Sequence, residues 1–186
     1  MTLAFPRIAL ATISIAVIAA CTGGETPAPL GNVPLTERVV EHLLAKADIE
    51  TSGGDAGGLD RSVEDLLAIA IAVNPTLATT TEAQWSVRWT ASGRPGLLMT
   101  LTRFHDATHA HAALDQIERG TAYRAMESPI GDRSALSPTN ADVGVAVTFV
   151  RGRTLVALQL PVASDGATLL DEQQMLKLAT LIDAKL

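Results

Sequence analysis

The histidines near the middle of the chain are the first residues whose types and spacing could do chemistry. His105 and His109 stand four residues apart, with Asp106 between them and His111 beyond. Histidines four apart on a helix share one face, so this pair could present two imidazoles to Zn²⁺ or Cu²⁺. A third ligand would have to come from elsewhere in the chain, and no His-Glu-x-x-His pattern occurs. Metal binding through His105 and His109 is therefore kept as an alternative, and no metal ligand is assigned.

No other segment marks a catalytic site. The glycine-rich run Gly53–Asp60 lacks the Gly-Lys-Ser/Thr ending of a phosphate loop, and it is a single copy of a pattern that binds calcium only in stacked repeats. The chain has no Gly-x-Ser-x-Gly motif, and Asp132 has the setting of a turn residue. We therefore expect no enzyme, no catalytic residue and no cofactor. An enzyme with a dispersed active site stays open as an alternative.

Two tryptophans form the most prominent aromatic pair. Trp85 and Trp89 share one side of a segment in which apolar and polar residues alternate, as in a half-buried strand. Two indoles on one strand face could line a ligand groove or an interface, although such rings more often belong to the core beneath a covering helix. The sequence leaves both interpretations open.

Cys21 is the only cysteine, and it closes the first hydrophobic segment. Arg7 precedes the apolar run Ile8–Ile18, and Ala19 and Ala20 stand directly before the thiol. This arrangement resembles the lipobox of bacterial lipoproteins, in which small residues precede an acylated cysteine. The resemblance implies that residues 1–20 are a signal peptide and that Cys21, as the lipid attachment site, carries a diacylglyceryl group.

The resemblance also implies a place in the cell. The apolar run is shorter than the roughly 20 residues that a membrane-spanning helix needs. We expect an extracytoplasmic protein held by its lipid to a bacterial membrane, either the cell membrane or the outer membrane. Residues 21–35 are rich in Pro and Gly and are expected to be a flexible tether, followed by a single domain over residues 36–186.

Periodicity predicts the elements of that domain. A helix is expected after Thr36, and a second over Val63–Val73, with Ser62 and Asp65 as a capping box and Asn74-Pro75 as its end. Because this second helix is apolar nearly all round, we expect it to be deeply buried or part of a binding surface. The elements expected beyond it are a hairpin of Trp85–Trp89 with Leu97–Phe104, a helix over Ala107–Arg119, a short strand near Ser134–Leu136, a hairpin of Val143–Val150 with Thr154–Pro161, and a helix over Thr168–Lys185.

The order of these elements, α-α-β-β-α-β-β-α, predicts an α+β fold. Its antiparallel sheet would have about four to five strands, and the repeated β-β-α unit suggests an internal duplication. The formal net charge of −6 argues against a nucleic-acid partner, which requires a basic face.

The function expected from these features is that of a non-catalytic binding or accessory module of a membrane or envelope protein complex. The further alternative is a carrier or sensor of a small apolar ligand, with the helix Val63–Val73 as a wall of its cavity.

Overall fold

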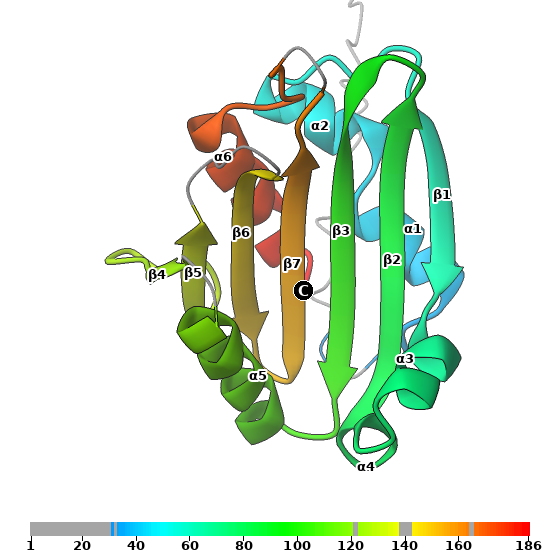
Figure 1. Ribbon diagram of the computed structural model, residues 1–186, viewed down its shortest axis with the longest axis vertical. Helices are drawn as coiled ribbons and strands as arrows, with labels where there is room; N and C mark the ends of the chain where they lie inside the picture. The colour runs from blue at the N-terminus through cyan, green and yellow to red at the C-terminus, as the bar shows by residue number, and fades with distance from the viewer. Residues whose placement is uncertain (1–30, 32, 121–122, 138–142, 164–165) are drawn as a thin grey trace, which may run out of the picture.

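The computed structural model describes residues 31, 33–120, 123–137, 143–163 and 166–186. Within these residues the chain forms one seven-stranded antiparallel sheet with the order β1-β2-β3-β7-β6-β5-β4 (Figure 1). The strands are β1 Asp60–Asp65, β2 Thr81–Ala91, β3 Arg94–Phe104, β4 Arg124–Ala125, β5 Arg133–Ser137, β6 Val143–Arg151 and β7 Thr154–Pro161. The helices are α1 Glu37–Leu43, α2 Lys46–Ser52, α3 Leu67–Val73, α4 Leu77–Thr80, α5 Ala107–Gly120 and α6 Glu172–Asp183.

Two hairpins form the centre of the sheet. The β2–β3 hairpin turns at Gly93 and the β6–β7 hairpin at Gly152, and both glycines have the positive φ that such tight turns favour. The hairpins join through β3 and β7, which pair antiparallel from Leu98↔Gln159 to Arg103↔Thr154. The predicted α+β class and both hairpins are confirmed, but the sheet is wider than the four to five strands expected.

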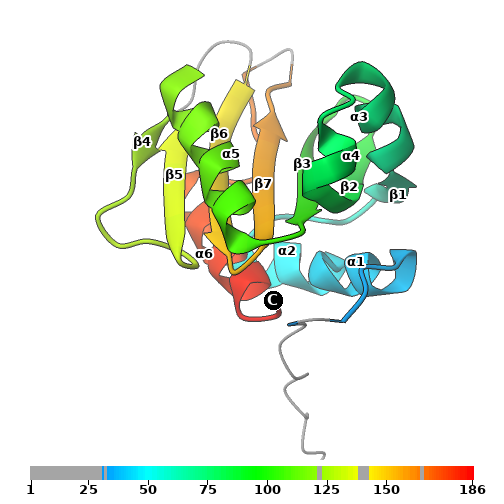
Figure 2. The same ribbon diagram turned by 90° about the horizontal axis from the view of Figure 1, so that it is seen from below.

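One face of the sheet, here called the α6 face, is covered by α1, α2 and α6 (Figure 2). A row of paired residues crosses the sheet on this face, and each of these side chains is almost fully buried: Val87, Met99, Leu158, Val147 and Leu136. The helices contribute Leu43, Ile49, Met175, Leu178 and Ile182 to the same cluster. This is the main hydrophobic core.

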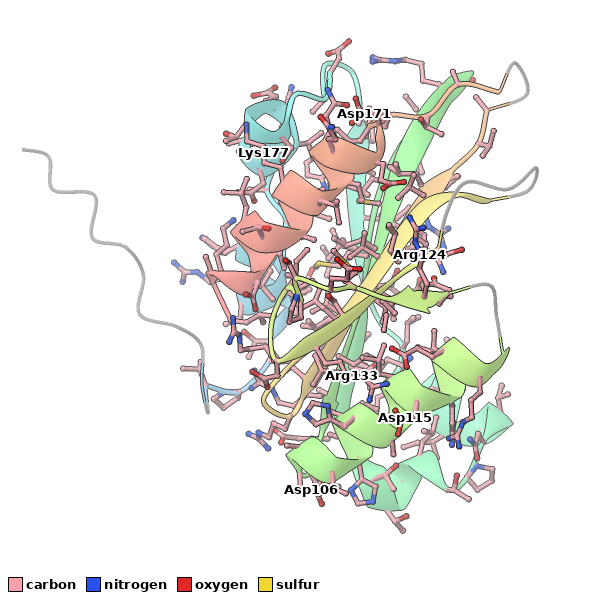
Figure 3. The ribbon with its side chains drawn as sticks, turned by 90° about the vertical axis from the view of Figure 1, so that its left-hand side faces the viewer. Asp106, Asp115, Arg124, Arg133, Asp171 and Lys177 are labelled. Carbon is pink, nitrogen blue, oxygen red and sulfur yellow. The ribbon has the colours of Figure 1, made fainter. Side chains whose placement is uncertain are left out.

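The opposite face, here called the α5 face, carries α5, α3 and α4 (Figure 2). Ala110 and Leu114 of α5 pack on Phe104, Val150 and Leu155 in a second, smaller cluster. Figure 3 shows Arg133 of β5 and Asp115 of α5 pointing toward one another, and their atoms Nη1 and Oδ1 lie 2.5 Å apart. The second guanidinium nitrogen of Arg133 binds Glu118, so α5 is fixed to the sheet by packing and by paired charges.

The predicted helix Val63–Val73 is wrong in its first half. Residues 60–65 form β1, and Val63 faces Val87 while Arg61 faces Trp89. Pairing with β2 buries one side of Val63 in the main core, which outweighs the local helical pattern. The helix α3 covers only Leu67–Val73, and Asp65 accepts a hydrogen bond from Leu67 N (2.9 Å) without Ser62 taking part.

The remaining predicted elements are shifted or divided. Thr36 caps the first helix as expected, but the chain breaks at Leu44 and starts α2 at Lys46. The short strand expected near Ser134–Leu136 is confirmed as β5, and the two-residue strand β4 pairs with it. The last helix begins at Glu172 because Asp171 and Gln174 form a capping box.

Candidate functional site

Part of the α5 face is not covered by a helix. In Figure 1 the helices α5, α3 and α4 lie over the lower ends of the strands, and the upper parts of β2, β3 and β7 are free on the side toward the viewer. Side chains alternate between the two faces of a strand. Val150 and Leu155 contact α5, so every second residue counted from them along β6 and β7 also points to the α5 face. Strand register then identifies the residues of this uncovered part.

Two rows of register partners cross the uncovered part, and we call them together the open surface. One row contains Ser62, Arg88, Leu98 and Gln159. The next row contains Glu64, Ser86, Thr100 and Ala157. Most side chains in these two rows are polar or small. The row of register partners that lies between them points to the α6 face and is entirely apolar. An antiparallel sheet with one face packed and one face toward solvent has this composition.

The second row continues to Thr148 of β6, which lies outside the open surface because its register partner on β5, Ala135, is fully buried in the α5 cluster. The side chain of Thr148 is 1% exposed, and its Oγ1 has no hydrogen-bond partner among the described residues. Gln84, one row further along β2, likewise has a buried Oε1 without a partner in the part of the chain that the structure describes. An unpaired buried polar group lowers stability by about 1–3 kcal/mol. Its presence therefore calls for a reason other than stability.

The segment that joins β1 to β2 forms a second distinctive surface. No charged residue or histidine occurs from Leu66 to Thr81, which includes α3 and α4. No residue of α3 is buried, and Ile69 and Val73 are 58% and 82% exposed. Of the two expectations for this apolar helix, deep burial is wrong. The apolar-carrier alternative needs the helix as a cavity wall, which an exposed α3 does not supply.

The histidines do not adopt the geometry that metal binding requires. His105 precedes α5, so it does not share a helical face with His109. The carboxylate of Asp106 accepts from His109 N (2.9 Å) and contacts His109 Nδ1 (2.9 Å). The hydrogen bond from His109 N, together with the imidazole, lowers the pKa of Asp106. Among the described residues no group of three or more His, Cys, Asp or Glu could hold a metal ion.

The glycine-rich loop is held by an arginine. Asp55 accepts a hydrogen bond from Gly57 N (2.9 Å), and Arg94 Nη2 donates to Asp55 Oδ2 (2.9 Å) and to Asp55 O (3.2 Å). The Gly57 hydrogen bond and the Arg94 charge both lower the pKa of Asp55. Arg94 starts β3, so these bonds fix the loop to the β2–β3 turn.

Asp132 is likewise a turn residue. Its Oδ2 accepts from Gly152 N (2.6 Å), and its Oδ1 lies 3.4 Å from Arg151 Nη1. The carboxylate therefore holds the β6–β7 turn.

The tryptophans lie in the core. Both project to the α6 face, where Trp89 is 5% exposed and the partly buried Trp85 packs against the main cluster. The Arg61 guanidinium lies 5.5 Å from the centre of the Trp89 ring, within the range of a cation–π contact. The Trp85 and Trp89 face is thus a packing face, and the ligand-groove interpretation is wrong.

Sequence reasoning did not select Arg88, Thr100, Thr148 or Gln159. Each is a polar residue in a strand segment where polar and apolar residues alternate, and this alternation was the signal available in the sequence. Alternation gives the face of a residue but not its neighbours on other strands. The open surface depends on the β3–β7 pairing, which brings Leu98 beside Gln159 and Thr100 beside Ala157.

Cys21, the predicted lipid attachment site, and residues 1–20, the predicted signal peptide, lie outside the described residues. In the described part of the chain no helix has the length and hydrophobicity needed to cross a membrane. No protein-family model matches the sequence, and no curated protein matches it.

Proposed function

We propose that this chain is a lipid-anchored extracytoplasmic protein that serves as a non-catalytic binding module of a membrane or envelope protein complex. The open surface is the part that receives the partner. The observation that carries this proposal is the set of solvent-accessible polar side chains, Arg88, Thr100 and Gln159, on the sheet surface that helices leave uncovered.

The open surface suits a protein partner. It offers the hydrogen-bonding groups of Arg88, Thr100 and Gln159 over a floor of small side chains, including Ser86 and Ala157. The other face offers no comparable surface, because α1, α2 and α6 cover it.

The lipid at Cys21 supplies the attachment to the membrane. Two acyl chains, at about 0.8 kcal/mol per buried methylene, hold a protein far more firmly than one chain does. The acidic balance of the chain makes it a poor ligand for anionic headgroups through its charges, so the lipid has to provide the anchoring. Residues 1–20 would be removed on export, and the membrane is the cell membrane or the outer membrane.

Site-specific photo-crosslinking in cells tests the binding proposal. A photoreactive residue in place of Arg88, which is exposed on the open surface, should give an adduct with a larger membrane or envelope protein. The matched control carries the same residue in place of Gln173, which is exposed on α6 at the opposite face. Equal crosslinking from both positions, or none from Arg88, would contradict the assignment of the open surface.

The anchor has its own test. Wild type should enter the detergent phase in a phase-separation assay, and the Cys21→Ser protein should remain in the aqueous phase. If wild type also stays in the aqueous phase, Cys21 carries no lipid.

A further inference from the structure

We propose that β1, the strand at one edge of the sheet, pairs antiparallel with β1 of a second copy of this chain, so that the two sheets become continuous. The two copies are related by a two-fold axis at Val63. This inference goes beyond the proposed binding of a membrane or envelope protein, and it depends neither on that binding nor on the lipid at Cys21.

The outer edge of β1 carries backbone groups that are free to pair. Leu66 N donates to the carbonyl oxygen of Gln84 (2.8 Å), and β1 pairs with β2 in unbroken register along its length. Hydrogen-bonded and non-hydrogen-bonded pairs alternate in an antiparallel ladder, so every second residue back from Leu66 bonds to β2. The N–H and C=O groups of Arg61, Val63 and Asp65 therefore point away from β2, and none of them has a hydrogen-bond partner among the described residues. Figure 1 shows β1 as the outermost strand, and Figure 2 shows α1 and α3 on opposite faces of the sheet beside it.

The charges of β1 fit a second copy centred at Val63. In this register Val63 pairs with its own copy, and Arg61 of each copy pairs with Asp65 of the other, which gives two pairs of opposite charge. Asp65 is exposed, and the hydrogen bond it accepts within the described part of the chain comes from Leu67 N (2.9 Å). The Arg61 guanidinium has five N–H donors, and Glu41 accepts from Nη1 (3.2 Å) and Nη2 (3.1 Å). Donors remain on Arg61 for a second carboxylate.

Other symmetric registers place like charges opposite one another. A centre at Ser62 pairs Asp60 with Glu64, and a centre at Glu64 pairs the two copies of Glu64. A centre at Arg61 or at Asp65 likewise pairs that residue with its own copy. Like charges directly opposite one another destabilise a sheet. Charged residues on an edge strand commonly prevent pairing with other chains, but the charges of β1 leave this one register open.

Both faces of the paired strands favour the same register. Val63 is partly buried against the main core beside Val87, and the second Val63 continues this apolar row from one sheet into the other. On the α5 face, Ser62 lies opposite Glu64 of the second copy. Arg88 follows Ser62 in the same row and forms no ion pair within the described residues, and it lies two strand spacings, about 10 Å, from that Glu64. The long side chain of Arg88 can cross the small Ser62 to reach this carboxylate.

Charge exchange between the copies tests the pairing in solution. Sedimentation equilibrium of the full-length chain with Cys21→Ser should show a reversible dimer. Arg61→Asp and Asp65→Arg each place like charges opposite one another, so each should raise the dissociation constant of its own dimer about tenfold or more. An equimolar mixture of the two variants restores opposite charges at both positions and should dimerise as the parent protein does. The matched control is Arg124→Asp, the same substitution in the exposed strand β4 at the other edge of the sheet, which should leave the dimer unchanged.

Disulfide formation tests the register and keeps Arg61 and Asp65 in place. With the axis at Val63, Ser62 of one copy and Glu64 of the other form a non-hydrogen-bonded pair with Cα atoms about 4.5 Å apart, which is within the range of a disulfide. Oxidation of a mixture of the Ser62→Cys and Glu64→Cys proteins, both in the Cys21→Ser chain, should therefore give a mixed disulfide dimer. Either protein alone should give far less, because two copies of one position lie about 7–8 Å apart, beyond that range.

Recovery of the dimer in the mixture of charge variants, together with the mixed disulfide, supports the inference. A monomer at every concentration without a mixed disulfide overturns it, and so does a dimer that neither charge variant weakens. Disulfides as abundant in the single-variant samples as in the mixture show a different register and overturn it too. If a charge variant does not fold, the disulfide experiment decides alone. Photo-crosslinking from Arg88 to a larger membrane or envelope protein reports the proposed function separately.

Discussion

Thr148 and Ser134 allow a paired test of buried hydrogen bonding in the sheet, because both hydroxyl residues are 1% exposed but only Ser134 has a hydrogen-bond partner among the described residues. Ser134 Oγ accepts from Ile130 N (3.0 Å) and lies 3.3 Å from Met126 Sδ. Thr148 Oγ1 has no partner in the described part of the chain. A substitution that removes each hydroxyl should therefore change the free energy of unfolding in opposite directions.

The magnitudes follow from these contacts. Thr148→Val replaces an unpaired hydroxyl with a methyl group and suits a strand, so we expect the free energy of unfolding to rise by about 1 kcal/mol. For a domain of this size that corresponds to about 2–4 °C in the melting temperature. Ser134→Ala leaves Ile130 N without its acceptor in the core, so we expect a loss of about 1–3 kcal/mol.

Urea unfolding of both variants in a Cys21→Ser background, which would lack the proposed acyl chains, is the suitable assay. The midpoint should move to higher urea for Thr148→Val and to lower urea for Ser134→Ala, with unchanged slopes. Destabilisation by Thr148→Val would show that the hydroxyl is already bonded.

Three further predictions concern the fold itself. Gly93→Ala and Gly131→Ala both place a side chain at positive φ, which lowers the free energy of unfolding by about 1–2 kcal/mol. Only at Gly131 would the new Cβ also collide with the Val150 carbonyl oxygen, so thermal unfolding should show a clearly larger loss of stability for Gly131→Ala. Equal losses for the two variants would contradict this close approach. Asp171→Ala removes the N-cap of α6, where Asp171 Oδ1 accepts a hydrogen bond from Gln174 N (2.8 Å). This substitution should lower the free energy of unfolding by about 1 kcal/mol. An unchanged urea midpoint would show that the cap does not contribute to stability. Acrylamide should quench the tryptophan fluorescence of the native protein only weakly, because Trp89 is 5% exposed and Trp85 packs against the core. Quenching as strong as in the unfolded chain would be inconsistent with that packing.

Local signals predicted the parts of the fold that local physics decides. The Gly93 and Gly152 turns and the alternation on either side of them specify the hairpins. Asp106 and the apolar periodicity that follows it specify α5. The error at residues 60–65 has a nonlocal cause. Ser62 and Asp65 were interpreted as the capping box of a helix over Val63–Val73, but Arg61 and Val63 are placed by their pairing with Trp89 and Val87 on another strand.

The candidate site was less predictable than the fold for the same reason. Each open-surface residue is unremarkable in its own segment, and the surface exists only after β3 pairs with β7. The sequence also did not predict whether α3 is buried or exposed, because an all-apolar helix is equally consistent with burial and with an exposed contact surface. The structure places α3 on the α5 face, where no residue of the helix is buried and Ile69 and Val73 are exposed.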